Sequence, residues 1–316
     1  MSYCILALDG GGIRGLLTAT ILKRLDAALP GWRSNTKMMA GTSTGGLLAM
    51  GLGLGKTPDD IIGFYKNSGP SIFHRPLLRE VRDLGSLIGA KYSNEVLLTT
   101  LTNLLGSRTQ LQDLSPTVVI PSFNLDSTYP YKDGTGKSEK VETWRPKIFH
   151  NDVADPNGND GKELCYNVGM RTSAAPTYFP SYGSFVDGGV VANNPSMVAL
   201  AQALVANAPG RGLNDITLLS IGTGVRESKV SGADHNWGGA DWLAAGVIDV
   251  FMDGAMDLTR YQCTQLLGQR FLRVSPYLAA NLPLDDASPE GLKHLEDIAN
   301  GMDLTSVTKW IQDNWK

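Results

Sequence analysis

Histidine and cysteine are scarce in this sequence. It contains four histidines and three cysteines among 316 residues. The cysteines, Cys4, Cys165 and Cys263, are odd in number and far apart, and none belongs to a Cys-x-x-Cys pair. The sequence therefore offers neither a disulfide framework nor a structural zinc site, and a reducing compartment fits best. The shortage of histidine also limits the side chains available for acid–base catalysis.

An excess charge of either sign is absent as well. The chain has 28 Lys and Arg against 31 Asp and Glu, a net charge of −3. No overall basic field exists to attract nucleic acid or an anionic membrane, so any lipid contact must be local. Hydrophobic residues make up 42% and charged residues 19%, which excludes a disordered chain. Glycine, in contrast, is abundant, with 36 residues.

Signal-peptide and membrane-span patterns are also missing. The apolar run at 4–8 ends at Asp9 and has no basic segment before it, which indicates a strand. Two uncharged stretches, 38–55 and 188–210, are rich in glycine or in hydroxyl and amide side chains, so they predict buried elements of a soluble protein. We expect a cytoplasmic protein that touches membranes at most peripherally.

Apolar runs and helical periodicities alternate along the first two thirds of the chain. This alternation predicts an α/β fold with a mostly parallel sheet. Strands are expected at 4–8, 37–40, 117–120, 147–150, 184–186 and 216–221, and helices at 16–29, 46–54, 94–105 and 195–206.

The remainder is mostly helical from residue 240, and a last helix is expected at 307–315. No repeat or linker is visible, so we expect one domain over 1–316, with a motif-bearing core at about 4–224 and helical additions at about 240–316. Polar, glycine-containing stretches predict surface loops at 126–145, 151–162 and 225–241.

A glycine-rich segment, Asp9-Gly10-Gly11-Gly12-Ile13-Arg14-Gly15, lies between the first strand and the first helix. Backbone N–H groups and the helix N-terminus favour negative charge there. A dinucleotide site would need an acidic residue about 20 positions later, and Ser34, Asn35 and Thr36 occupy that region. Tight packing of strand on helix is a second interpretation. The third is an oxyanion hole.

A second glycine motif, Gly41-Thr42-Ser43-Thr44-Gly45, also lies between a strand and a helix. This G-x-S-x-G pattern is typical of a nucleophile elbow, whose flanking glycines allow the sharp turn that projects the serine. A Ser–acid–His triad would use Asp187 with His235 or His294. Both histidines lie in polar segments typical of a surface, which favours a carboxylate as the base.

Asp187 is that candidate base. It follows the apolar strand expected at 184–186 and precedes Gly188 and Gly189. Burial there would raise the pKa of the carboxyl toward the range useful for a general base. The alternative interpretation of Asp-Gly-Gly is a plain turn.

Taken in this order, the three motifs closely resemble those of the patatin-like phospholipase family. The segments 172–180 and 220–224 also resemble it, so the similarity covers about 4–224. The resemblance implies a three-layer α/β/α sandwich and a Ser–Asp dyad that hydrolyses acyl esters of lipids, such as phospholipids, galactolipids or lysolipids, with no metal or cofactor.

By motif match, the resemblance makes Ser43 the nucleophile, Asp187 the general base and Gly10, Gly11 and Gly12 the oxyanion loop. Arg14 matches the family arginine, which would either stabilise the loop or attract a lipid phosphate. The alternatives left open are acyl transfer to another acceptor through the same acyl-enzyme, and a nucleotide-binding module. The oligomeric state is left open too.

The lipid-facing surface is less clearly marked. The segment 72–79 mixes apolar and basic residues and fits the rim of an acyl groove, a contact with a bilayer or a packed turn. Trp237 and Trp242 fit either a mobile lid or core packing, and core packing is expected. On a helix near residue 250, we expect the solvated side to carry Asp249, Asp253 and Asp257, and the buried side to carry Val247, Val250, Phe251 and Leu258.

Overall fold

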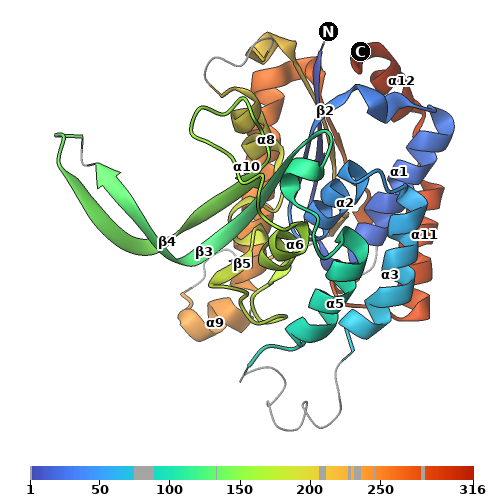
Figure 1. Cartoon of the computed structure of the whole chain (residues 1–316). Helices are drawn as coiled ribbons and strands as arrows, with labels where there is room; N and C mark the ends of the chain where they lie inside the picture. Colours follow the sequence, from blue (N-terminus) through green and yellow to red (C-terminus); the bar gives the residue numbers. More distant parts are fainter. Residues whose placement is uncertain are drawn as a thin grey trace.

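A mostly parallel β-sheet lies between two layers of helices (Figure 1). The computed structural model describes residues 2–74, 89–132, 134–205, 211–226, 229–230, 236–244, 246–278 and 282–316. The sheet has the order β4-β3-β2-β1-β6-β8, and β5 pairs with β3 on the side of β2. Its strands are β1 (Tyr3–Leu8), β2 (Thr36–Gly41), β3 (Thr117–Lys132), β4 (Ser138–His150), β5 (Phe185–Asp187), β6 (Ile216–Ile221) and β8 (Phe271–Val274).

The alternation of side chains along β1 explains the two helical layers. Cys4, Leu6 and Leu8 face one core and Ile5 and Ala7 the other, because successive residues of a strand point to opposite faces. The first core is covered by α1 (Gly15–Ala28), α2 (Thr44–Gly53), α3 (Pro58–Ile72), α5 (Asn94–Leu105), α6 (Cys165–Ser173), α11 (Pro289–Gly301) and α12 (Thr305–Asn314). The second is covered by α8 (Ser196–Ala203) and α10 (Val247–Leu267).

This arrangement confirms the predicted three-layer α/β/α sandwich. β1, β2, β3, β6 and β8 run parallel, whereas β4 and β5 are antiparallel to β3. The smaller elements are α7 (Gly189–Ala192), α9 (Gly239–Ala244), the pair β7 (Val225–Arg226) and β9 (Tyr277–Leu278), and the short 3-10 turns Gly12–Arg14, Trp32–Asn35, Leu111–Asp113, Leu213–Asp215 and Gly268–Arg270. No helix in the described parts of the chain has the length and apolar character needed to cross a membrane.

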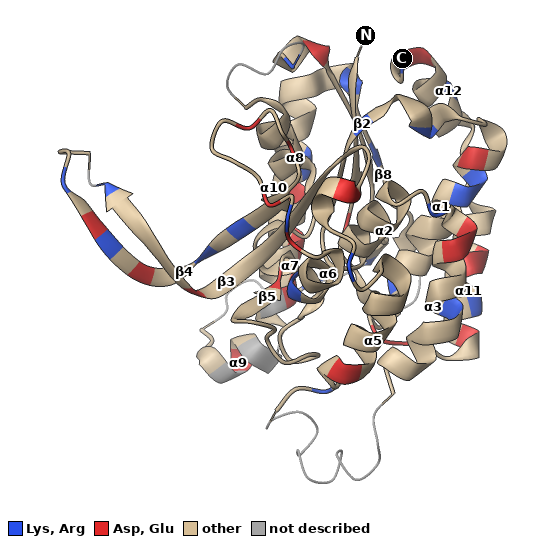
Figure 2. Ribbon diagram, viewed as in Figure 1, with Lys and Arg blue, Asp and Glu red and all other residues tan. Residues whose placement is uncertain are grey.

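The prediction of a surface loop at 126–145 is wrong. Residues 126–132 and 138–145 extend β3 and β4 into a long antiparallel pair, the β3/β4 arm, which projects from the body (Figure 1). Both faces of its outer part are exposed to solvent, so it carries charged residues of both signs where a half-buried strand would alternate apolar and polar residues (Figure 2). The predicted loop 225–241 likewise contains β7 and the start of α9. The loop predicted at 151–162 is confirmed.

Candidate active site

A cavity of about 1210 Å³ opens at the carboxyl ends of β1, β2 and β6. Ligands of open α/β sheets commonly bind at this edge. The cavity is lined by Gly10, Gly11, Gly12, Ser43 and Asp187 together, although these residues come from three separate motifs. The fold therefore brings all the main predicted site residues into one pocket.

Ser43 sits on the sharp turn between β2 and α2. Its backbone φ is 52°, in the region that side-chain-bearing residues rarely adopt. A Cβ on Gly41 would lie 2.0 Å from the carbonyl oxygen of Gly45, and a Cβ on Gly45 would lie 2.1 Å from that of Leu8. Both flanking glycines are thus required by close backbone approach, as the elbow interpretation predicts.

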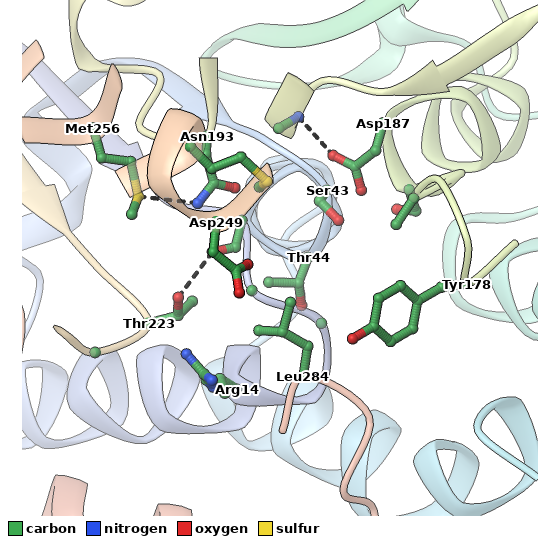
Figure 3. A pocket seen from close by; sticks show the side chains of 18 of the residues that line it. Arg14, Ser43, Thr44, Tyr178, Asp187, Asn193, Thr223, Asp249, Met256 and Leu284 are labelled. Atoms are coloured by element: carbon green, nitrogen blue, oxygen red, sulfur yellow. Dashed lines mark hydrogen bonds between the residues drawn. The ribbon is translucent and has the colours of Figure 1, made fainter. Parts of the chain in front are cut away.

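Asp187 faces Ser43 from the end of β5 (Figure 3). The side chain is buried, and burial raises the pKa of its carboxyl from 3.8 to about 6. Hydrogen bonds from the Ser43 hydroxyl and from the Gly189 N–H, the latter 2.7 Å from Oδ1, favour the charged form and limit this rise in pKa. Asp187 is therefore not in a plain exposed turn, and its carboxylate can serve as a base near neutral pH.

Thr172 on α6 joins the serine turn to the aspartate turn. Its hydroxyl accepts a hydrogen bond from the Ser43 N–H at 2.9 Å and donates to the Pro121 carbonyl at 2.6 Å. Its own carbonyl accepts the Gly188 N–H at 3.3 Å. Sequence reasoning did not assign Thr172 a role, and its place in the family-like segment 172–180 was the only signal.

The glycine loop passes directly beside Ser43. A Cβ on Gly10 would lie 3.3 Å from the Ser43 Cβ. The Gly10 N–H donates to the Asn193 carbonyl at 3.0 Å, whereas the N–H groups of Gly11 and Gly12 have no hydrogen-bond partner within the described residues. Of the three predicted oxyanion donors, Gly11 and Gly12 are therefore the ones available.

Arg14 is buried and turned toward the C-terminal part of the chain. Its Nε donates to the Leu282 carbonyl at 2.8 Å, and its Nη2 donates to the same oxygen. The neighbouring Ile13 N–H donates to the Leu284 carbonyl at 2.8 Å. Burial lowers the pKa of the Arg14 guanidinium, and the nearby Arg226 lowers it further. These contacts favour the loop-stabilising role over attraction of a lipid phosphate.

A buried ion pair at the base of the loop escaped the sequence analysis. Arg273 on β8 makes a two-point contact with Asp9, with Nη1 2.8 Å from Oδ1 and Nη2 bonded to Oδ2. The same Nη1 donates to the Ser220 hydroxyl at 2.8 Å. The pair holds the end of β1, from which the glycine loop starts. Nothing near Arg273 in the sequence identifies a partner so far away along the chain.

The rest of the pocket has an apolar part and a charged part. The apolar part includes Leu47, Phe64, Ile72, Phe73 and Phe179. In the segment predicted at 72–79, Ile72 and Phe73 thus border the pocket, and residues 75–79 lie outside the described residues. The charged part carries Arg226, Arg260 and the three aspartates of α10, Asp249, Asp253 and Asp257.

Several peripheral predictions are settled by burial. Asp249 and Asp257 are exposed as expected, but Val250, Phe251 and Leu258 are exposed too, so the predicted buried side of α10 is wrong. Among the described side chains of α10, the buried ones are Cys263 and Leu267, which lie on another side of the helix.

The two tryptophans also differ from expectation, because Trp242 is exposed and makes an edge contact with Trp237. Surface exposure of His294 is confirmed, and His235 lies outside the described residues. Within the described ranges, no three His, Cys, Asp or Glu side chains lie close enough together to hold a metal ion.

Comparison with known proteins agrees with this geometry. The sequence profile of the family described as "Patatin-like phospholipase" matches residues 6–200. Patatin-like protein 1 of Arabidopsis thaliana is 31% identical, over 96% of this chain and 79% of its own length. The cGAMP-activated phospholipase of Vibrio cholerae is 29% identical, over 96% of this chain and 91% of its own length. Protein teg of Priestia megaterium is 27% identical, over 99% of each chain.

Proposed function

The chain belongs to the patatin-like phospholipase family, and on this premise we propose that it hydrolyses carboxylic esters of lipids through an acyl-enzyme on Ser43. One observation carries the proposal: Ser43, held at a positive φ, faces the buried Asp187 in a cavity of about 1210 Å³ that is partly lined by apolar side chains. The substrates we propose are acyl lipids such as phospholipids, galactolipids or lysolipids, reached by transient contact with a lipid surface.

In the first step, the Asp187 carboxylate takes the proton of the Ser43 hydroxyl as Oγ attacks the acyl carbonyl carbon. The N–H groups of Gly11 and Gly12 stabilise the oxyanion, a role supported by their position at the cavity and by the lack of a hydrogen-bond partner for either group within the described residues. Collapse of the tetrahedral intermediate breaks the bond to the alcohol, which leaves with the proton from Asp187. Ser43 then carries the acyl group as an ester.

In the second step, Asp187 takes a proton from water, and the resulting hydroxide attacks the acyl-enzyme. The same two amides stabilise the second oxyanion. Breakdown releases the fatty acid and returns the proton to Ser43. The pKa of about 6 for Asp187 supports this double use, because the carboxyl is mostly ionised at neutral pH yet still accepts a proton readily.

Replacing the nucleophile tests the proposal. We expect Ser43→Ala to abolish fatty-acid release from phospholipids, galactolipids, lysolipids and short soluble esters, and to abolish covalent labelling by an organophosphonate, because no other group would form the acyl-enzyme. Ser173→Ala is the matched control, since Ser173 also borders the cavity. It should remain labelled. Labelling that persists in Ser43→Ala, or that is lost in Ser173→Ala instead, would refute the assignment.

A further inference from the structure

The outward side of α10 exposes large apolar side chains to solvent. Phe251 is 71% exposed, Leu258 is 56% exposed and Tyr261 is 57% exposed. Val250 is exposed on the same side, and the residues between them there, such as Gly254, carry no charge. With 3.6 residues per turn, these positions form one continuous stripe along the helix. Monomeric proteins rarely leave such a patch uncovered unless it binds something.

This stripe continues into the mouth of the cavity. Phe251 both borders the cavity and is largely exposed, and the same holds for Val190 on α7, which packs against α10. Trp242 on α9, immediately before α10, is also exposed. We define the α10 surface as Val190, Trp242, Val250, Phe251, Leu258 and Tyr261. A molecule lying on the α10 surface would therefore have direct access to Ser43 through the cavity.

The charges beside the α10 surface indicate what kind of lipid fits. Asp249, Asp253 and Asp257 line the flank of α10 that faces the cavity. Arg226 is paired with Asp249 at 2.5 Å, and Arg260 with Asp257 at 2.8 Å. Among the described residues of this flank, three acids and two arginines give no excess of positive charge to attract anionic headgroups. Tyrosine and tryptophan, in contrast, are favoured at the headgroup level of any bilayer.

From this geometry we propose that the α10 surface is the site that docks the enzyme on a bilayer of neutral, zwitterionic lipids, so that an acyl chain passes along Phe251 into the cavity. The inference rests on the proposed function for its purpose, because docking would bring substrate to Ser43. Its driving force is burial of apolar area, and binding should therefore be nearly independent of salt and of added anionic lipid.

Vesicle flotation with diether phosphatidylcholine, which no esterase can cleave, tests the proposal. We expect the wild-type chain to bind, with an affinity that changes less than about twofold between low and high salt or on adding phosphatidylglycerol. The double variant Leu258→Ser/Tyr261→Ser should bind about tenfold more weakly, because it removes apolar area from the contact. Neither residue borders the cavity, so its kcat/KM on a short soluble ester should be unchanged.

Trp144→Ser is the matched control, since Trp144 is a 69% exposed aromatic on the β3/β4 arm. It should bind vesicles like the wild type. Equal vesicle binding by the double variant, an equal loss in Trp144→Ser, or binding that depends on phosphatidylglycerol would overturn the proposal. So would a wild-type dimer that the double variant dissociates, because the surface would then bind a second copy.

The two proposals fail separately. A wild-type chain that cleaves soluble esters but does not bind vesicles refutes only the docking surface. A chain that binds vesicles through Leu258 and Tyr261, yet cleaves no ester, refutes only the hydrolase.

Discussion

At the scale of single residues, the environment of Asp187 sets a conflict between stability and activity. Burial favours the neutral carboxyl in the folded protein, whereas the proposed role of Asp187 as the base needs the carboxylate. The folded-state pKa is about 6 and the ordinary value is 3.8. Folding stability contributed by this group is therefore fully present below about pH 4 and is lost as the pH rises through 6.

The variant Asp187→Asn should separate the two effects. At pH 8 we expect it to be more stable to unfolding by up to about 3 kcal/mol, since a pKa difference of one corresponds to about 1.4 kcal/mol, and the gain should vanish near pH 4. Ester hydrolysis should be lost at every pH, while kcat/KM of the wild type rises through about pH 6 and then levels. Urea unfolding at pH 4 and pH 8 measures the change in stability, and a pH–rate profile measures the change in activity. A wild-type rate that does not fall below pH 6 would contradict the role of Asp187.

The residues that sequence reasoning found are those whose chemistry is local. Gly41, Ser43 and Gly45 predict a sharp turn. The strained residue, Ser43, and the two glycines that allow close backbone approach lie within five positions of the sequence. Thr172 and Arg273 act on partners far away in the chain, and no local pattern marks a hydroxyl or a guanidinium for such a contact. They became visible only when the fold brought the segments together.

At the scale of elements, the sheet was predictable where it is buried on both faces. β1, β2 and β6 are short apolar runs, as burial on both sides requires. The β3/β4 arm was missed because its outer part is not buried on either face and its composition is that of a loop. The predicted buried side of α10 was wrong because we assumed that the larger apolar side of this helix faces the core, whereas that side is exposed to solvent.

The β3/β4 arm should be dispensable for the fold and for the reaction. Beyond the pair Ser127–Thr143, the described residues of its two strands pair only with each other in the sheet, and none of these described residues borders the cavity. We expect replacement of residues 128–142 by Asn-Gly, which favours a tight hairpin turn, to leave the melting temperature and the soluble-ester kcat/KM close to the wild-type values. Differential scanning calorimetry and the ester assay check this. A loss of activity without unfolding would show that the arm acts on the site.

At the scale of the whole molecule, segments from the early and the late part of the sequence come together at one site. The family-matched region, residues 6–200, contains Ser43, Asp187 and the glycine loop. The Asn193 carbonyl within this region accepts from the Gly10 N–H, but three further contacts of the loop come later in the chain: Thr223 donates to the Gly10 carbonyl, Arg273 pairs with Asp9, and Leu282 accepts from Arg14. These contacts support the expectation that residues 1–316 act as one domain.

Breaking the Asp9–Arg273 pair by removing one partner should therefore strongly lower global stability. We expect Arg273→Met to lower the free energy of unfolding by about 3–5 kcal/mol, because it leaves the buried Asp9 carboxylate without its partner. The double variant Asp9→Asn/Arg273→Met should recover part of this loss, since no buried charge then remains unpaired. Urea denaturation of the wild type, both single variants and the double variant gives the four unfolding free energies of a double-mutant cycle. Strictly additive losses would contradict direct coupling of the two side chains.

The late position of these supporting groups also has a consequence for biosynthesis. A ribosome releases Ser43 and Asp187 well before Arg273, Leu282 and Leu284, so the nascent chain carries the proposed nucleophile and base while the glycine loop still lacks these three contacts. The N–H groups of Gly11 and Gly12, the proposed oxyanion donors, would be fixed only once Arg273, Leu282 and Leu284 have docked. Such an order of assembly would keep the proposed hydrolase inactive until these later segments have been made and folded.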